Sequence, residues 1–211
     1  PSAVARMENL EMWSDEHFDA LRKQMLPLAQ AGQKVITATL NRDPWGYQTF
    51  DDYEDMILWT LHKDGTWSFD YTVFDRWVEL MMSLGVNKMI NCYSMLPWEN
   101  RLHFFDEKKN ERSLKKIAPG SKEFEMYWGA FLTDFVKHLD EKGWLEITNI
   151  AADERHPEDM VEANRVLTKY APQLGFAMAD KHGSYRRFMN IKDCCVAQRQ
   201  LYLTAEELAQ R

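Results

Sequence analysis

The sequence predicts an α/β fold in which about five βα units form part of a TIM-like (β/α) barrel. Amphipathic helical stripes end at glycines and are followed by short strands rich in β-branched residues, and this order repeats along the chain. The strands are too apolar to leave one face in water, which is typical of a parallel sheet covered on both sides. Because a closed barrel has eight strands, the visible units predict an incomplete one.

An open doubly wound sheet is the alternative arrangement for repeated βα units. Such folds commonly hold phosphate groups at a glycine-rich turn after a strand, and neither GxGxxG nor GxxxxGK(S/T) occurs in this chain. The missing motifs favour the barrel. No low-complexity stretch or linker interrupts the sequence, so residues 1–211 are expected to be one segment of a single barrel domain.

The first predicted helix follows thirteen residues without a clear period. Ser14 is a suitable N-cap, and two acidic residues after it occupy the first turn, where carboxylates are favoured. Pro27 is expected to kink or shorten the last turns of this helix. Gly32 then ends it before a strand at 34–40.

Three further helical stripes precede strands. Gly85 and Gly143 end two of these helices, Ser121 is a suitable cap for the longest one, and Pro157 suits the first turn of the last. The predicted helices are 74–84, 121–142, 157–170 and a helix start at 204–207. The predicted strands are 88–93, 145–152, 175–179 and a run around 194–196.

Two long insertions interrupt this order, and each follows a strand. Residues 57–71 predict a β-hairpin around Asp64-Gly65, a strong turn signal. The polar stretch 100–119 predicts a second hairpin around 108–111. Both are expected at the C-terminal face of the barrel, where (β/α) enzymes build their clefts.

The composition narrows the class of function. The formal net charge of -7 provides no basic field that would displace counterions from phosphates, so nucleic acid is not an expected partner. Three cysteines, two of them adjacent, form neither a disulfide framework nor a CxxC metal spacing. No stretch is long and apolar enough to span a membrane. The chain begins with Pro1, so the lack of a signal peptide assigns no compartment.

Two neighbouring acids, Asp153 and Glu154, follow a buried strand and directly precede a helix start. A (β/α) barrel presents its catalytic groups at this end of a strand. Two carboxylates this close repel each other, which suits a pair with one protonated and one ionised member. The alternative is structural: Glu154 pairs with Arg155 at the surface, and Asp153 caps the helix at Pro157.

Aromatic and amide side chains at the ends of two successive strands are candidate substrate contacts. Trp45 follows the first predicted strand, and Asn91, Tyr93 and Trp98 lie in or after the next one. Flat rings stack on the apolar faces of sugars and other ring ligands. Packing that anchors a loop is the alternative for each ring, and satisfying loop backbone is the alternative for Asn91.

No metal site is predicted. Residues at the strand ends that could be drawn as a ligand set are Asp153, Glu154, His156, Asp180 and His182. Neither HxH nor HExxH spacing supports such a set. No serine lies in a nucleophile elbow, so Ser-His-Asp catalysis is not expected either.

Five separated blocks occur in the order GQKVIT (32–37), DPW (43–45), WSFDYTVFD (67–75), INCYSM (90–95) and DER (153–155). Together they resemble the catalytic domain of glycoside hydrolase family 123, from about Trp13 to the C-terminus. The resemblance implies a TIM-like barrel that cleaves terminal β-linked N-acetylgalactosamine. It also implies a β-sandwich domain before the barrel and further barrel strands after it, neither of which this chain contains.

The resemblance further implies a mechanism without metal or cofactor. Similar hexosaminidases use an adjacent Asp-Glu pair that aligns with Asp153 and Glu154. Glu154 is then the general acid, and the 2-acetamido carbonyl of the substrate attacks the anomeric carbon to form an oxazolinium ion. Asp153 orients the acetamido N–H, Glu154 next activates water, and the configuration is retained.

A glycan or glycoconjugate is the partner that the resemblance implies, and it favours a periplasmic or secreted location. His182 is a candidate sugar contact, although its loop, KHGSYRR at 181–187, is larger and more charged than the family pattern leads us to expect. One alternative function is a non-catalytic glycan-binding barrel or inactive fragment. Another is a different barrel hydrolase or a metal-dependent isomerase. The residues assign neither galacto against gluco preference nor an oligomeric state.

Overall fold

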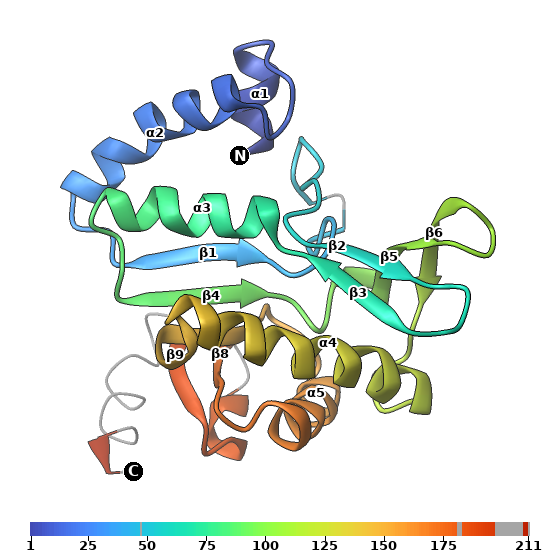
Figure 1. Cartoon of the computed structure of the whole chain (residues 1–211). Helices are drawn as coiled ribbons and strands as arrows, with labels where there is room; N and C mark the ends of the chain where they lie inside the picture. The colour runs from blue at the N-terminus through green and yellow to red at the C-terminus, as the bar shows by residue number, and fades with distance from the viewer. Residues whose placement is uncertain (47, 181–182, 197–208, 211) are drawn as a thin grey trace.

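The order of strands and helices in the computed structural model follows most of the predicted order (Figure 1). The structure describes residues 1–46, 48–180, 183–196 and 209–210. The α-helices are α1 (Ser2–Met7), α2 (Asp15–Gln30), α3 (Thr72–Ser83), α4 (Lys122–Lys142) and α5 (Pro157–Tyr170). The strands are β1 (Val35–Thr39), β2 (Leu58–Leu61), β3 (Trp67–Asp70), β4 (Met89–Tyr93), β5 (Arg101–Asp106), β6 (Glu111–Lys116), β7 (Thr148–Ala152), β8 (Gly175–Asp180) and β9 (Ile191–Val196). Short 3-10 turns are η1 (Trp98–Asn100), η2 (Leu145–Ile147) and η3 (Ser184–Arg187). The helix start predicted at 204–207 lies outside the described residues.

The main sheet contains five strands in the order β1-β4-β7-β8-β9, and every neighbouring pair is parallel. The order follows the chain, so the strand order does not reverse anywhere in the described sheet, as it does in a doubly wound fold. The predicted α/β class with five parallel strands is therefore confirmed. Within the described chain β1 and β9 do not pair, so the sheet is open and the TIM-like barrel is not confirmed.

The two faces of the main sheet differ in chemistry because side chains alternate along each strand. One face belongs to the apolar core and carries Ile36, Ile90, Ile150 and Phe176. The strand register aligns four smaller or polar residues on the other face, namely Thr37, Asn91, Asn149 and Gly175. Thr37 on this face is exposed, but Asn91 and Asn149 are buried, so the expectation that no face lies in water holds for β4 and β7 although this face is polar.

The polar face is concave. Asn91 on β4 donates from Nδ2 to Asp193 Oδ2 on β9 at 2.7 Å, although β7 and β8 lie between these strands. In a flat sheet three strand spacings would separate the two strands by about 14 Å, which is more than these short side chains span. The sheet must therefore curl around this face.

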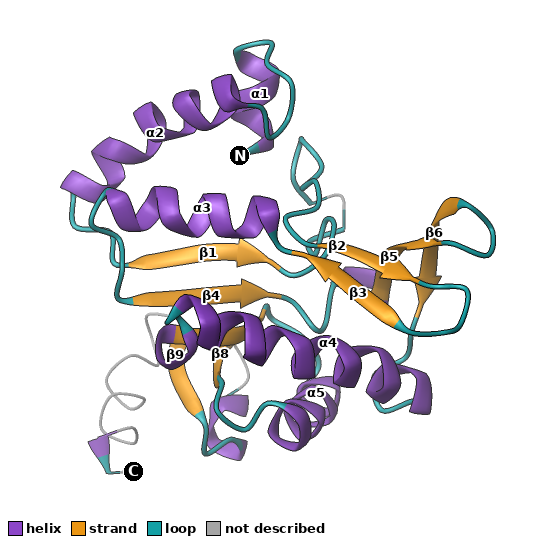
Figure 2. Ribbon diagram, viewed as in Figure 1, coloured by secondary structure: helices purple, strands orange, loops and turns teal. Residues whose placement is uncertain are grey.

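Both predicted hairpins are present, and they join into a second sheet with the order β3-β2-β5-β6. The join is a short parallel pairing of residues 60–61 with 105–106. The second sheet lies beyond the carboxyl ends of β1 and β4 (Figure 2). Asn41 holds it there, because its Nδ2 donates to His103 O and its Oδ1 accepts from His103 N. The insertions therefore lie at the predicted ends of the strands.

Aromatic side chains fill the space between the second sheet and α4. Trp59 stacks on Phe131 with ring centroids 4.6 Å apart and meets Trp128 edge-on at 5.1 Å. Trp59 Nε1 also donates to the carbonyl of Leu40, just after β1, so one indole joins the two sheets. Much of the aromatic content of the chain thus stabilises the core.

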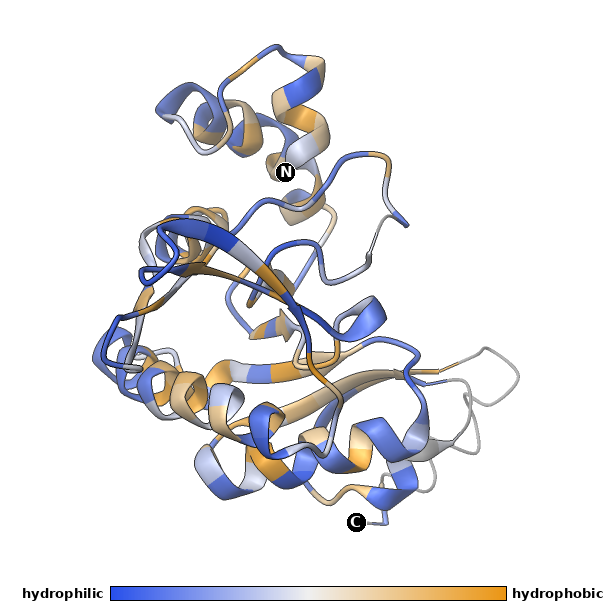
Figure 3. Ribbon diagram, turned by 90° about the vertical axis from the view of Figure 1, so that its right-hand side faces the viewer, coloured by the Kyte–Doolittle hydropathy of each residue, from blue (hydrophilic) through white to orange (hydrophobic). Residues whose placement is uncertain are grey.

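The long helices begin and end close to the predicted cap residues. Ser14 Oγ accepts from His17 N, and Ser121 Oγ accepts from Phe124 N, both at 3.1 Å. Gly143 ends α4 with a φ of 71°. Hydrophobic and hydrophilic segments alternate along the helices (Figure 3), as expected when one side of a helix packs on the core. None of the described helices combines the length and apolar character that crossing a bilayer requires.

Three local expectations need correction. Residues 2–7 form α1, which is too short to show a helical period in the sequence. The helix α2 continues through Pro27 to Gln30, so the proline does not shorten it. Residues 145–147 form the turn η2, so β7 begins at Thr148.

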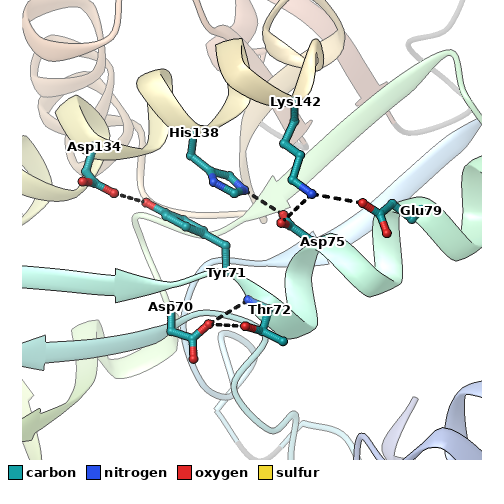
Figure 4. A network of polar contacts seen from close by, with 8 residues as sticks. All are labelled: Asp70, Tyr71, Thr72, Asp75, Glu79, Asp134, His138 and Lys142. Atoms are coloured by element: carbon teal, nitrogen blue, oxygen red, sulfur yellow. Dashed lines mark hydrogen bonds and ion pairs between the residues drawn. The ribbon is translucent and has the colours of Figure 1, made fainter.

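A polar network joins α3 to α4 (Figure 4). His138 Nε2 lies 2.7 Å from one carboxylate oxygen of Asp75, and Lys142 Nζ lies 2.8 Å from the other. The Tyr71 ring stacks on His138 with centroids 4.0 Å apart, and its hydroxyl donates to Asp134. Burial raises the pKa of Tyr71 above its ordinary value, so this hydroxyl keeps its proton.

Replacing Asp75 by Asn should lower the free energy of unfolding by about 1–2 kcal/mol, because a neutral amide weakens two contacts of a largely buried carboxylate. Glu79→Gln is the matched control. It also weakens a contact with Lys142, but its side chain is 56% exposed, and we expect less than about 0.5 kcal/mol. Urea unfolding followed by Trp fluorescence measures both values. Equal losses in the two variants would contradict the role of the network.

Candidate active site

Asp153 and Glu154 lie at the carboxyl end of β7 in different environments. Asp153 is half-buried, whereas Glu154 is exposed. Asp153 Oδ1 accepts from the backbone N–H of Glu154 at 2.9 Å, and Asp153 Oδ2 accepts from Trp98 Nε1 at 3.4 Å. The Asp153 carboxylate is thus oriented by two donors, while the side chain of its neighbour is accessible to solvent.

The sequence left open that Asp153 caps the helix at Pro157. In the structure His156 caps this helix instead. His156 is the N-cap of α5, and its Nδ1 accepts from a backbone N–H in the first turn at 3.4 Å. Arg155 donates from Nη2 to Asn100 Oδ1 at 2.9 Å and lies 3.8 Å from Asp159. Asp153 therefore has no part in starting the helix.

The rings of Tyr93 and Trp45 pack against each other, and Tyr93 lies close enough to Asp153 to feel its charge. Tyr93 ends β4, and its ring centroid lies 5.4 Å from that of Trp45. Trp45 in turn meets Tyr53 edge-on at 4.8 Å. Burial first, and then the negative charges of Asp153 and Asp193, raise the pKa of Tyr93 to about 12. The phenol therefore stays protonated at neutral pH and is able to donate a hydrogen bond close to these acids.

Trp98 connects the loops that follow β1 and β4. Its backbone N–H donates to the carbonyl of Pro44 at 2.8 Å. Gly46 has a φ of 50°, and a Cβ there would lie 3.0 Å from the Cβ of Trp98, so glycine fits this contact best. The Arg155 guanidinium lies 4.9 Å from the centroid of the indole ring. Trp98, predicted as a stacking residue, thus has a cation over its ring and donates its indole N–H to Asp153.

Asn91 binds protein groups with both ends of its amide. It is 5% exposed, its Nδ2 donates to Asp193, and its Oδ1 accepts from Asn149 Nδ2 at 3.0 Å. Gly175 makes room for this chain of contacts, since a Cβ there would lie 2.1 Å from Asn149 Oδ1. Sequence reasoning missed Asn149, Asp193 and Gly175. The sequence does contain a signal for them: each is a polar residue or a glycine within a largely apolar strand. The strand register aligns Asn91, Asn149 and Gly175, and places Asp193 on the adjacent strand β9.

Asp180, another predicted strand-end residue, is buried at the end of β8 and binds a backbone group. Asp180 is 4% exposed, and its Oδ2 accepts from the backbone N–H of Tyr185 at 2.8 Å. His182 lies outside the described residues. In the part of the chain that the structure describes, no group of three or more His, Cys, Asp or Glu side chains is arranged to hold a metal ion.

A pocket of about 480 Å³ lies at the second sheet rather than at the acid pair. Arg42, Asp55, Trp59 and Phe105 are among its lining residues, and neither Asp153 nor Glu154 contributes to it. The acids lie instead at the carboxyl end of β7, the central strand of the main sheet, where Glu154 meets solvent. Their chemistry, and not the volume of this pocket, therefore marks the candidate active site.

Comparison with known proteins assigns the chain to a class and then to a family. The model of the glycoside hydrolase 123 catalytic domain matches residues 1–211, which makes the chain a member of a glycosidase family. The chain belongs to glycoside hydrolase family 123, and the predicted resemblance is confirmed. A search of curated proteins gave no match.

A solved structure of a family 123 glycoside hydrolase from Clostridium perfringens, described in a study of glycolipid glycan hydrolysis, is similar in sequence and fold. The identity is 29%, the TM-score is 0.85, and the similarity covers 93% of this chain. The matched region is 36% of the Clostridium chain, so the present chain spans about a third of that relative's length.

Tyr93 should ionise well above pH 10, where an ordinary tyrosine is half ionised, because burial and two nearby carboxylates oppose the phenolate. Absorbance at 295 nm, compared between the wild type and Tyr93→Phe, isolates this group over the pH range in which circular dichroism shows a folded protein. The two titration curves should therefore coincide through pH 10. A step near pH 10 that is missing from the variant would contradict the position of Tyr93 beside the acids.

Proposed function

We propose that the chain is the catalytic domain of a retaining β-N-acetylgalactosaminidase, which releases terminal β-linked N-acetylgalactosamine with the help of the substrate's own acetamido group. The observation that carries this proposal is the adjacent pair Asp153 and Glu154 at the end of β7 in a member of glycoside hydrolase family 123. We also propose that the main sheet is part of a (β/α) barrel, to which residues 1–211 contribute one segment.

The adjacency of the two acids favours an internal nucleophile. A retaining enzyme that attacks with its own carboxylate needs an acid and a nucleophile on opposite sides of the sugar bond, about 5 Å or more apart. Asp153 and Glu154 are consecutive, and the carboxylate of Asp153 is turned towards the Trp98 indole and the Glu154 backbone. An attacking group supplied by the substrate removes the need for that separation.

The first half of the reaction forms a cyclic ion. Asp153 accepts the acetamido N–H with a remaining lone pair and so points the acetamido carbonyl oxygen at the anomeric carbon. That oxygen forms a bond to the anomeric carbon as the glycosidic bond breaks. Glu154 donates its proton to the departing glycosidic oxygen, and the products are an alcohol and an oxazolinium ion. The negative charge of Asp153 stabilises this cation.

The second half reverses the roles of the groups. The Glu154 carboxylate takes a proton from water as the water oxygen attacks the anomeric carbon. The bond from the acetamido oxygen to that carbon breaks, and the acetamide is restored. Two displacements at one carbon give net retention, and Glu154 regains its proton for the next cycle. Its exposure suits this exchange of alcohol for water.

The neighbours of Asp153 support a glycan as the substrate class. Trp45 offers a ring to the apolar face of a sugar, and Tyr93 offers a neutral hydroxyl donor. The solved relative is described as acting on the glycan of a glycolipid, and we propose glycans of glycolipids or other glycoconjugates as the substrates of this chain. His182 stays a predicted sugar contact.

Glu154→Gln should lower kcat/KM on an oligosaccharide about 10²- to 10⁴-fold, because its leaving group needs a proton. The loss should be much smaller on an aryl N-acetyl-β-galactosaminide, whose leaving group departs without one. Asp153→Asn should impair both substrates, because it removes the acceptor and the charge that steer the acetamide. Steady-state kinetics of the protein that carries this domain measure all four values.

Glu158→Gln is the matched control for these variants. It lies in the first turn of α5, its side chain is 69% exposed, and it contacts Arg187. We expect wild-type kinetics from it. Wild-type turnover in both Glu154→Gln and Asp153→Asn would reject the proposed mechanism, and saturable sugar binding without product release in the wild type would indicate a glycan-binding protein.

A further inference from the structure

The geometry points to Arg155 as a positioning residue that fixes the direction of the Asp153 carboxylate through the indole of Trp98. This inference rests on the proposed function, because it deepens the role of Asp153 in steering the acetamide. Arg155 itself is not proposed to touch the substrate. It acts by holding the ring whose N–H meets the carboxylate.

Among the described residues, Trp98 is the one side chain that donates a hydrogen bond to the Asp153 carboxylate. The Glu154 backbone N–H holds Oδ1 at 2.9 Å, and the indole, which has one N–H and no acceptor, sets the position of Oδ2. The donor–acceptor distance of 3.4 Å is long for an N–H···O bond. A small rotation of the ring would break this contact, and a small tilt towards Asp153 would strengthen it.

Backbone contacts hold the base of the Trp98 side chain in place. The backbone of Trp98 is fixed by its bond to Pro44 O and by close contact with Gly46. Glu99 and Asn100 follow with φ values of 62° and 54°, so the turn η1 has a defined left-handed shape. These contacts place the Cβ of Trp98, but the direction of the indole also depends on what covers its face.

The positively charged side chain of Arg155 covers one face of the Trp98 ring. The Arg155 guanidinium lies 4.9 Å from the ring centroid, where attraction to the ring quadrupole favours it. Its side chain is only 10% exposed. Asn100 Oδ1 accepts from Nη2 at 2.9 Å, and Asp159 lies 3.8 Å away on α5. The guanidinium is therefore anchored on two sides, and both anchors belong to elements that flank the acid pair.

The sequence position of Arg155 couples this anchor to the acid itself. Its backbone N–H donates to the carbonyl of Asp153, so the turn that presents the carboxylate also presents the guanidinium. A purely structural role for Arg155 would be to fasten η1 to α5. That role predicts a loss of stability, whereas the positioning role predicts a loss of turnover that requires the indole N–H.

A double-mutant cycle separates these roles. Trp98→Phe keeps an aromatic face under the guanidinium and removes the N–H, while Arg155→Met removes the charge and keeps much of the volume. Each single variant should lower kcat on an aryl N-acetyl-β-galactosaminide about 10- to 100-fold with little change in KM. The double variant should be no slower than Trp98→Phe alone, because Arg155 has no effect once the N–H is absent.

Two further variants test the physical reason. Arg155→Lys should recover part of the lost turnover, since a cation over the ring is retained. Arg165→Met is the matched control on α5, where Arg165 contacts Glu125 and Glu162, and it should keep wild-type kcat. Urea midpoints recorded for every variant show whether a change in kcat is accompanied by unfolding.

Multiplying losses in the double variant would overturn the inference, because they would show that the two residues act independently. Wild-type kcat in Arg155→Met would overturn it as well. If Asp153→Asn is impaired while Trp98→Phe and Arg155→Met are not, the inference fails and the proposed function stands. If Asp153→Asn keeps wild-type turnover, the proposed function fails first.

Discussion

The hydrogen bond between Asn91 and Asp193 is the contact on which the shape of the site depends. It joins β4 to β9 across two intervening strands at 2.7 Å, which requires a curled sheet with one concave face. Asn149 extends the contact, and Gly175 leaves the space for it. Because the carboxyl ends of all five strands share this curvature, the loops that follow β1, β4 and β7 are brought close together at one end of the sheet.

Those loops then fix each other rather than relying on the sheet alone. The loop after β1 accepts the backbone N–H of Trp98 and packs Gly46 against it, while Trp45 covers Tyr93. The loop after β7 contacts the loop after β4 in turn, because Arg155 lies over the Trp98 ring. Loops held by one another in this way are able to orient a carboxylate, which a single mobile loop would not do.

The parts of the fold that could be predicted are those with local causes. Gly143 ends a helix and Asp64-Gly65 turns a hairpin through their own backbone preferences, so each was visible in the sequence. The pairing of β2 with β5 joins residues more than forty positions apart and depends on tertiary packing, so no local sequence pattern predicts it. In the site, the adjacent acids Asp153 and Glu154 could be identified from the sequence. The hydrogen bond from Asn91 to Asp193 could not, because it forms only when the sheet is curled.

The central claim is that the substrate's acetamido oxygen, steered by Asp153, attacks the anomeric carbon. The most direct test is the rate of cleavage of aryl N-acetyl-β-galactosaminides whose acetyl group carries zero, one, two or three fluorine atoms. Fluorine withdraws electrons from the attacking oxygen, so kcat/KM should fall steeply and steadily along the series. A flat series would contradict the claim, because an attacking group supplied by the enzyme would not respond to the acetyl group.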